Sequence, residues 1–318
     1  MSNEPHIDIT VVVPLFNEAE SLKELYAQIT DALSDEYQFE VIFVDDGSDD
    51  ESFDVIKELG RHHSNVKGIS FRRNYGKSSA LQKGFEQSEG RYIITMDADL
   101  QDDPHEIPEM VQMLKDGLDL VSGWKKKRHD PISKTIPSRF FNKVTSKMSG
   151  IKLHDFNCGL KAYKREVIEH IYLYGEMHRY VPLLSKWQGF DKIGEKVVTH
   201  HPRKFGKSKF GLNRFINGFL DLITLLFVNK FAQKPMHFFG SIGSISLLAG
   251  GIITVYLTYM RIFYDMYLSN RPLLIFGVLF VILGIQFFSI GFVGELIINR
   301  DKKQEQINFK DSTGLTNE

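Results

Sequence analysis

The chain has very little cysteine. Cys158 is the single cysteine among 318 residues, so no disulfide can form within the chain, and a reducing, intracellular setting fits this composition. We also expect no secretory signal at the start of this sequence. The first ten residues contain no basic stretch, and the first apolar run is interrupted by Asp8 and stops at Pro14. We therefore expect the folded part of the protein to lie inside the cell.

Two glycine motifs that bind phosphates are missing as well. No G-x-G-x-x-G follows the first apolar run, and G-x-x-x-x-G-K-[ST] does not occur. Both motifs hold phosphates on backbone N–H groups at the start of a helix. Their absence argues against dinucleotide oxidoreduction and P-loop hydrolysis. A bound nucleotide would have to be held by side chains and a metal.

The net charge of −1 hides an uneven distribution of charge. Residues 124–147 contain eight Lys or Arg and one acid, and residues 196–214 contain six basic residues and no acid. Such clusters predict acidic partners, which we expect to be phosphate-bearing small molecules or lipids and no nucleic acid.

Segments that suit strands alternate with segments that suit helices. The expected strands are residues 7–13, 39–44, 66–71, 92–96 and 118–122. The segments between them carry apolar side chains three or four residues apart, which is typical of amphipathic helices. This alternation predicts an α/β fold with a mainly parallel sheet covered on both faces. In such a sheet the ligand site lies at the carboxyl ends of the strands.

The chemically most informative stretch is residues 95–104, where an apolar run ends in four aspartates and a proline that suits a helix start. In an extended segment, Asp97 and Asp99 would face the same way while Ala98 faces inward. Carboxylates without nearby Cys or His suit Mg²⁺ or Mn²⁺ better than zinc. A helix cap would explain one aspartate, but two repelling carboxylates need a compensating charge, which favours a metal.

Two later segments, residues 138–149 and 154–163, also allow predictions. A helix is expected from about residue 138 to residue 149. Residues 154–163 carry small and polar side chains where a compact domain would prefer apolar ones. We therefore expect residues 154–163 to line the site rather than the core.

Two long apolar runs, Met236–Met260 and Leu273–Ile298, dominate the last part of the chain. The first has no charged residue between its ends, and the second has only Glu295. Each is long enough to span a bilayer, and two such runs in succession favour membrane spans over buried core helices. Basic residues are more numerous outside the pair than in the connecting loop, so both termini should be cytoplasmic.

Residues 210–231 carry apolar side chains at helical spacing between basic residues. They suit a helix that lies on an anionic membrane surface, and a core helix packed on the soluble domain stays open as the alternative. The basic run at residues 203–209 comes immediately before them. It is well placed to hold a lipid phosphate at the level of the headgroups.

Several motifs, taken in order, resemble those of one known family. They are Pro14-Leu15-Phe16-Asn17-Glu18, Val44-Asp45-Asp46-Gly47-Ser48, Asp97-Ala98-Asp99-Leu100-Gln101, Ser138-Arg139, Cys158-Gly159-Leu160-Lys161-Ala162-Tyr163 and Gly206-Lys207-Ser208-Lys209. The chain resembles family 2 inverting glycosyltransferases of the GT-A fold, in the polyprenyl-phosphate (dolichol-phosphate mannosyltransferase-like) branch. The resemblance covers nearly the whole chain, including the paired C-terminal membrane helices.

The resemblance implies roles for individual residues. The donor nucleotide would be held by Pro14, Phe16, Glu18, Asp46, Lys77 and Ala98. The divalent metal, Mg²⁺ or Mn²⁺, would be held by Asp97, Asp99 and Gln101. The donor and acceptor phosphates would be met by Arg139, Arg203, Lys207 and Lys209. Lys125 joins this phosphate set, because the chain has Gly123-Trp124 where many relatives place Ser-Arg. The catalytic candidates are Asp99 and Asp155.

The resemblance also implies an organisation of the chain. It comprises a cytoplasmic GT-A (Rossmann-like) domain at residues 1–208, an amphipathic juxtamembrane helix at 209–234, two transmembrane helices at 235–300 and a polar cytoplasmic tail at 301–318. We expect an integral protein of the cell inner membrane. Glycines in the first span permit close helix contacts, including those of a homo-oligomer.

The implied reaction is inverting transfer of one sugar from a nucleotide sugar, UDP- favoured over GDP-, to undecaprenyl or dolichyl phosphate. A lipid phosphate with a second pKa of about 6 is largely dianionic in the cytosol, so it needs positioning more than deprotonation. Two alternatives stay open. A glycan or glycerolipid hydroxyl acceptor would call for a general base. The other alternative is a non-catalytic membrane scaffold.

Overall fold

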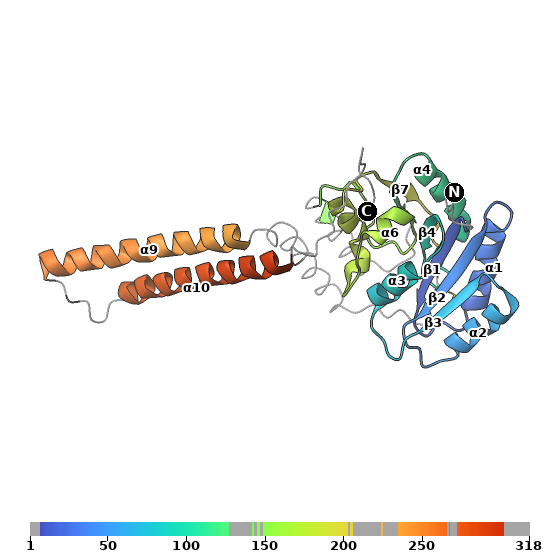
Figure 1. Cartoon of the computed structure of the whole chain (residues 1–318), viewed down its shortest axis with the longest axis horizontal. Helices are drawn as coiled ribbons and strands as arrows, with labels where there is room; N and C mark the ends of the chain where they lie inside the picture. Colours follow the sequence, from blue (N-terminus) through green and yellow to red (C-terminus); the bar gives the residue numbers. More distant parts are fainter. Residues whose placement is uncertain are drawn as a thin grey trace, which may run out of the picture. The chain divides into compact units, whose positions relative to one another are not determined.

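The computed structural model describes residues 7–126, 142, 145–146, 149–202, 204–205, 224, 235–265, 267 and 272–301. The chain divides after residue 222 into two compact units. The first unit holds the strands of the described chain, and the second holds two long helices (Figure 1).

The first unit is built on one sheet of seven strands in the order β3-β2-β1-β4-β6-β5-β7. The strands are β1 Ile9–Leu15, β2 Phe39–Asp45, β3 Val66–Ser70, β4 Tyr92–Thr95, β5 Leu120–Trp124, β6 Lys161–Lys164 and β7 Ile193–Val197. Only β6 runs antiparallel to its described neighbours, β4 and β5. The sheet is therefore mainly parallel, as the sequence predicts.

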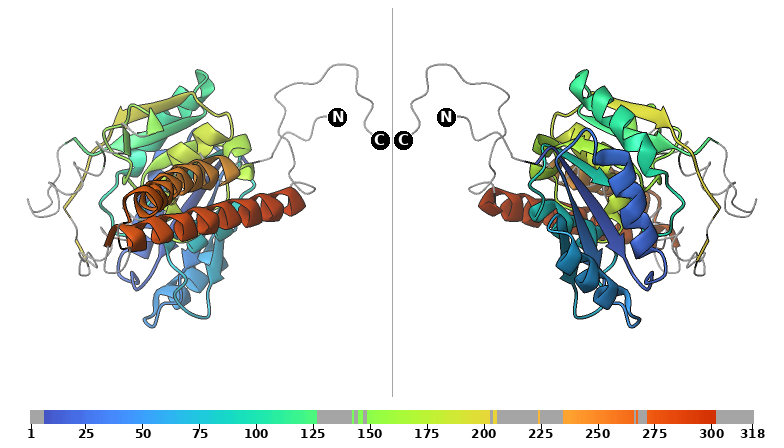
Figure 2. Two further views of the ribbon diagram at one scale, coloured as in Figure 1. Left: turned by 90° about the vertical axis from the view of Figure 1, so that its left-hand side faces the viewer. Right: turned by 90° about the vertical axis from the view of Figure 1, so that its right-hand side faces the viewer.

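Helices cover both faces of this sheet. The α-helices are α1 Leu22–Leu33, α2 Ser52–His62, α3 Lys77–Glu86, α4 Ile107–Lys115, α6 Arg165–Glu169 and α7 Val181–Trp187, and the short 3₁₀ helices are η1 Pro104–Glu106 and η2 Met177–Arg179. Helices α1, α2 and α4 lie over the face that the right-hand view of Figure 2 presents. Val11 and Val13 belong to the core on that side, whereas Val12 lies against Gly84 of α3 on the other face.

The helical periodicity is confirmed in detail. Leu22, Leu25, Ile29 and Leu33, which recur three or four residues apart, are all buried on one face of α1. The strands differ from expectation by up to two residues at their ends. The described part of the helix expected at residues 138–149 is too small to test that prediction.

The prediction that residues 154–163 line the site rather than the core is wrong for most of the segment. Phe156, Leu160 and Ala162 are fully buried, and Cys158 is nearly so. The reason is strand β6, which inserts between β4 and β5 and places this segment in the middle of the sheet. The small side chains of this segment therefore allow close packing within the sheet and need not mark a ligand site.

Within the described residues, the second unit contains α9, Pro235–Tyr264, and α10, Pro272–Asp301, which are long and apolar enough to cross a membrane. Glycines hold the two helices close together, because a Cβ on Gly250 would lie only 2.8 Å from the carbonyl oxygen of Gly277. Ser246 Oγ donates a hydrogen bond of 2.7 Å to the carbonyl oxygen of Phe280. Most other apolar side chains of the pair are exposed, Ile252 by 68%, which suits a surrounding of lipid rather than a protein core.

Candidate active site

The acidic stretch begins where β4 ends. Strand β4 stops at Thr95, and Ala98 and Asp99 form a turn in which Leu100 has a φ of 59°. The buried side chain of Leu100 anchors this turn in the core. The segment is therefore not extended through Asp99, so the argument that residues two apart face the same way does not describe it. Convergence of Asp97 and Asp99 on one ion stays a prediction.

Asp97 lies among lysines. Its carboxylate forms an ion pair with Lys77, the first residue of α3. Burial alone would raise the pKa of this carboxyl, but the nearby charges of Lys77, Lys125 and Lys161 lower it to about 2. Asp97 is therefore ionised at any physiological pH, which is the state that can bind a cation.

Lys161 is unusual because it is a buried lysine, only 4% exposed. Its ammonium donates to the carbonyl oxygen of Cys158. Burial and then the charge of Lys77 lower the pKa of Lys161. From the sequence, Lys161 belongs to a family motif and to the segment expected to line the site, but it has no individual role.

Lys125 also points inward. Its Nζ lies 2.6 Å from Oδ1 of Asp102, whose side chain is fully buried. Burial alone would lower the pKa of Lys125, but the carboxylates of Asp102 and Asp97 raise it above its ordinary value. The phosphate contact expected of Lys125 stays a prediction, because this ammonium already has a carboxylate partner.

The loops after β1 and β2 are joined by hydrogen bonds. The backbone N–H of Asn17, which has a φ of 56°, donates to Ser48 Oγ at 2.9 Å, and that of Glu18 donates to Ser52 Oγ at 3.0 Å. Pro14 lies in β1 and is buried, and Phe16 and Glu18 are half-buried in the loop that follows. These three predicted nucleotide-binding residues thus lie at the carboxyl end of β1.

Asp46 lies next to them at the end of β2. Its carboxylate accepts hydrogen bonds from the backbone N–H groups of Tyr75 at 2.7 Å and Gly76 at 2.9 Å. Burial raises the pKa of Asp46, while these two hydrogen bonds act in the opposite direction. Because Gly76 directly precedes α3, Asp46 links the end of β2 to the loop that places Lys77.

Gln101, another predicted metal ligand, contacts a distant part of the chain. Its carbonyl oxygen accepts from the backbone N–H of His201 at 2.9 Å, and Asp102 forms a β-bridge with His200. Residues 200–202 thus run alongside the acidic turn and lead directly into the basic run at 203–209. No local pattern in the sequence could have revealed this pairing of residues about 100 apart.

Asp155, the second catalytic candidate, is 1% exposed. Its Oδ1 accepts from the backbone N–H of Asn157 at 3.1 Å, and its own N–H donates to Glu195 at 3.1 Å. This environment holds the loop before β6 in place, and a catalytic role for Asp155 stays a prediction. Four other candidates lie outside the described residues, namely Arg139, Arg203, Lys207 and Lys209.

The donor set around the turn fits a metal that arrives with its nucleotide. Within the described ranges, no three His, Cys, Asp or Glu side chains are grouped so that they could enclose an ion. Mg²⁺ is commonly bound by one or two carboxylates together with substrate phosphates and water. Asp97, held ionised, and the half-buried Asp99 and Gln101 can supply such a partial shell.

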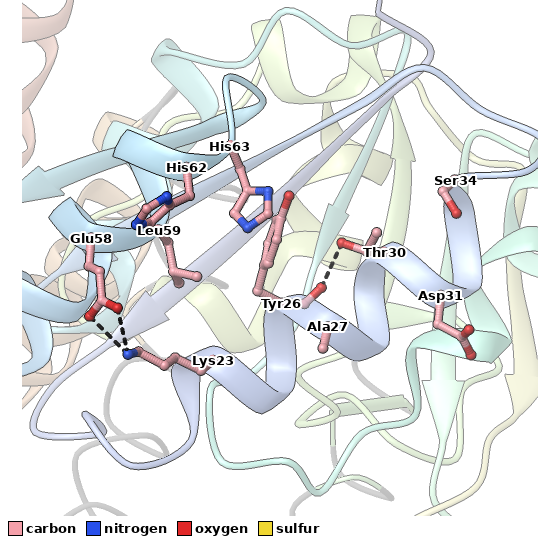
Figure 3. Close-up of a pocket in the computed structure, with 10 residues that line it drawn as sticks. All are labelled: Lys23, Tyr26, Ala27, Thr30, Asp31, Ser34, Glu58, Leu59, His62 and His63. Carbon is pink, nitrogen blue, oxygen red and sulfur yellow. Dashed lines mark hydrogen bonds and ion pairs between the residues drawn. The ribbon is translucent and has the colours of Figure 1, made fainter.

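A surface groove of about 570 Å³ lies elsewhere, between α1 and α2 (Figure 3). Its walls include the ion pair of Lys23 with Glu58, at 2.8 Å, and the rings of Tyr26 and His63, whose centroids are 4.6 Å apart. Residues 62–63 precede β3, so this groove extends towards the amino ends of the strands. It is not the site that the acidic turn forms.

Comparisons with known proteins agree on one family. The family model described as glycosyl transferase family 2 matches residues 10–172. The chain is 36% identical over 303 residues to dodecaprenyl-phosphate galacturonate synthase of Rhizobium johnstonii, covering 93% of this chain and 90% of that protein. It is 35% identical over 299 residues to undecaprenyl-phosphate 4-deoxy-4-formamido-L-arabinose transferase of Yersinia pestis, covering 93% of this chain and 89% of the relative.

Solved structures show the same fold at low identity. Glucosyl-3-phosphoglycerate synthase from Mycobacterium tuberculosis, in complex with phosphoglyceric acid, superposes with a TM-score of 0.55 at 19% identity, over 70% of this chain and 80% of that one. The same synthase with Mn²⁺, UDP-glucose and glycerol 3-phosphate gives a TM-score of 0.52 at 20% identity, with the same two coverages. At this identity the likeness establishes the Rossmann-like GT-A fold alone.

Proposed function

The chain belongs to glycosyltransferase family 2, and from this premise we propose that it transfers one sugar, with inversion, from a nucleotide sugar to a polyprenyl phosphate. Two relatives that match over nine-tenths of this chain are named for reactions on dodecaprenyl and undecaprenyl phosphate. The two apolar helices α9 and α10 support the proposal, because they would keep the enzyme at the membrane that contains such an acceptor.

The observation that carries the proposal is the ion pair of Asp97 with Lys77. Asp97 lies just past the carboxyl end of β4, held ionised by lysines that would also attract a diphosphate. A divalent metal bound there would stabilise the negative charge of the departing nucleoside diphosphate. Asp97, Asp99 and Gln101 would hold this metal. Lys77 then faces the same phosphates from the start of α3.

The nucleoside lies, in this proposal, against the loops after β1 and β2. Pro14, Phe16 and Glu18 contact it from one loop, and Asp46 does so from the other. Ala98 contacts it from the acidic turn. The hydrogen bond from Asn17 to Ser48 supports this arrangement, because it joins the loops after β1 and β2, and the bond from Tyr75 to Asp46 ties the end of β2 to the loop before α3. Rigid walls lower the entropy that binding must overcome.

The acceptor phosphate must be bound by cations and held in the correct position, but it does not need a general base. A phosphate monoester with a second pKa of about 6 is already a nucleophile at cytosolic pH. The buried position of Asp155 agrees with this chemistry, because the reaction does not call for an exposed carboxylate there. Arg203, Lys207 and Lys209 would hold the lipid phosphate, with Lys125 and Arg139 contributing. The β-bridge between Asp102 and His200 supports this, because it brings His200, which precedes the basic run in the sequence, alongside the acidic stretch.

The proposed setting follows from the same features. Residues 1–208 form the cytoplasmic GT-A domain, 209–234 the interfacial helix, 235–300 the two spans and 301–318 a cytoplasmic tail of an inner-membrane protein. The excess of basic residues outside the two spans supports this orientation. We favour UDP over GDP as the donor nucleotide, and a homo-oligomer through the spans.

Purified full-length protein tests the reaction directly. Incubation with Mg²⁺ or Mn²⁺, polyprenyl phosphate and a panel of UDP- and GDP-sugars should yield a glycosylated lipid phosphate, and Asp99→Asn should abolish it. Polyprenol, which lacks the phosphate, is the matched control acceptor. Equal transfer to polyprenol would favour the hydroxyl-acceptor alternative. Absence of product with every donor, from protein that remains folded, would favour the scaffold.

A further inference from the structure

Gly159 lies directly against the carboxylate of Asp97. A Cβ built on Gly159 would stand 2.5 Å from Oδ2, 2.7 Å from Cγ and 3.0 Å from Oδ1 of that side chain. All three distances are far inside van der Waals contact for carbon with these atoms. The whole carboxylate group therefore rests on the bare Cα of Gly159, and no other amino acid leaves room for it.

The requirement for glycine here is one of space and not of backbone conformation. Several glycines of the chain have positive φ angles that favour glycine, Gly76 and Gly117 among them, but Gly159 does not. An alanine at residue 159 would therefore keep an ordinary backbone. The three atoms nearest to its Cβ would all belong to Asp97.

The loop that carries Gly159 is held from several sides. The carbonyl oxygen of Gly159 accepts from the hydroxyl of Thr95 at 2.9 Å, and that of Leu160 accepts from the N–H of Gly123 at 2.9 Å. Lys161 donates to the carbonyl oxygen of Cys158. Cys158 and Leu160 are themselves buried in the core.

The opposite side of the contact is more exposed. Asp97 follows the end of β4, and its side chain is 33% exposed and turned to Lys77, itself 26% exposed. A larger side chain at residue 159 would meet a fixed loop on one side and a carboxylate at a surface on the other. Asp97 is the partner that would be displaced.

We infer that Gly159 is a positioning residue for the metal-binding carboxylate of Asp97, and that the loop Cys158–Lys161 is the fixed surface on which this carboxylate rests. The inference rests on the proposed function, since it concerns the same metal and nucleotide. It extends that function to a glycine and a buried lysine to which the sequence reasoning assigned no role. Lys161 acts through this loop, because its ammonium holds the carbonyl group of the residue before Gly159.

Gly159→Ala is the direct test. Mutating a residue that orients a metal ligand typically costs about 10–100-fold in metal affinity. We therefore expect UDP-dependent Mn²⁺ binding, measured by electron paramagnetic resonance on full-length protein, to weaken at least about tenfold. GDP replaces UDP in this experiment if the wild type binds it better. Transfer activity should show the same loss at low Mn²⁺, partial rescue at high Mn²⁺, and an unchanged KM for polyprenyl phosphate.

Gly60→Ala is the matched control. A Cβ at Gly60 in α2 meets only the carbonyl oxygen of Val66 at 3.5 Å, an ordinary contact. This variant should bind Mn²⁺ as the wild type does. Should Gly159→Ala fail to fold, Thr95→Val provides a second variant, because it removes the hydrogen bond to Gly159 at nearly equal volume. We expect Thr95→Val to weaken Mn²⁺ binding several-fold with Asp97 intact.

The outcomes distinguish the positioning role of Gly159 from the proposed function. Wild-type Mn²⁺ affinity in a folded Gly159→Ala protein, or in Thr95→Val where that variant replaces it, would overturn the positioning role and leave the proposed function standing. A uniform loss of activity without a change in Mn²⁺ binding would also overturn it. Failure of the wild type to bind Mn²⁺ with any nucleotide would overturn the proposed function and, with it, this inference.

Discussion

Replacing Asp102 with asparagine should destabilise the sheet domain by about 3 kcal/mol, because it leaves the ammonium of Lys125 buried without its main counter-charge. The two groups lie 2.6 Å apart, and their side chains are 0% and 14% exposed. Breaking a buried ion pair by removing one partner typically costs about 3–5 kcal/mol. We take the lower end, because Asp97 also interacts favourably with Lys125.

For a domain of this size, 3 kcal/mol corresponds to a fall of about 6–12 °C in the midpoint of thermal unfolding. Tryptophan fluorescence measures this midpoint well, because both tryptophans, Trp124 and Trp187, belong to the first unit. Asp35→Asn, at an exposed position after α1, is the control for loss of one negative charge and should shift the midpoint by less than about 2 °C.

The double variant Asp102→Leu with Lys125→Met should recover most of the loss, since replacing a buried ion pair with apolar side chains is often neutral. A single variant as stable as the wild type, or a double variant no more stable than the single, would refute this reasoning. Sugar transfer by the double variant then decides the role of Lys125. Retained transfer assigns it to structure, and lost transfer in a stable protein assigns it to phosphate binding.

Three further predictions concern other parts of the molecule. Hydrogen bonds to Asp103 and then Asp31 raise the pKa of His105 in the folded state. The contribution of His105 to stability is therefore complete below about pH 6.5, and it is lost as pH rises through the pKa of the folded state. Thermal unfolding should show that His105→Gln loses less stability than the wild type between about pH 6 and 8.5. Asp46→Asn should weaken UDP binding, measured by calorimetry, at least about tenfold. The amide of Asn has one acceptor oxygen, so it can replace only one of the two hydrogen bonds that Asp46 accepts from the backbone N–H groups of Tyr75 and Gly76 in the loop before α3. Gly250→Leu should separate α9 from α10 and lower the thermal stability of the second unit, followed by circular dichroism, whereas Leu at the uncontacted Gly251 should not.

Much of the fold follows from local pattern. The four leucine and isoleucine positions of α1 recur at helical spacing and are all buried, so the helix and its inner face can be predicted together. The mainly parallel sheet follows in the same way from alternation of strands and helices. Strand β6 could not be predicted, because Lys161–Lys164 has the composition of a surface segment. Its place between β4 and β5 depends on pairing across the sheet.

The candidate site, like strand β6, could be predicted only in part from the sequence. Four aspartates lie within residues 97–103, and the sequence predicts a role only for Asp97 and Asp99. In the structure Asp97 faces Lys77, Asp102 is buried with Lys125, and Asp103 contacts His105 at 2.8 Å. Two of these three partners come from other loops, so their assignment requires the tertiary structure. The presence of a metal site could be predicted from composition, but the division of roles could not.

The central claim is that the turn after β4 holds a divalent metal together with a nucleoside diphosphate. Its most direct test is the anomalous difference density of Mn²⁺ in crystals of the protein grown with Mn²⁺ and UDP or GDP. The account predicts one strong peak between the carboxylates of Asp97 and Asp99, next to the diphosphate. A nucleotide bound with no Mn²⁺ peak at these two side chains would contradict it.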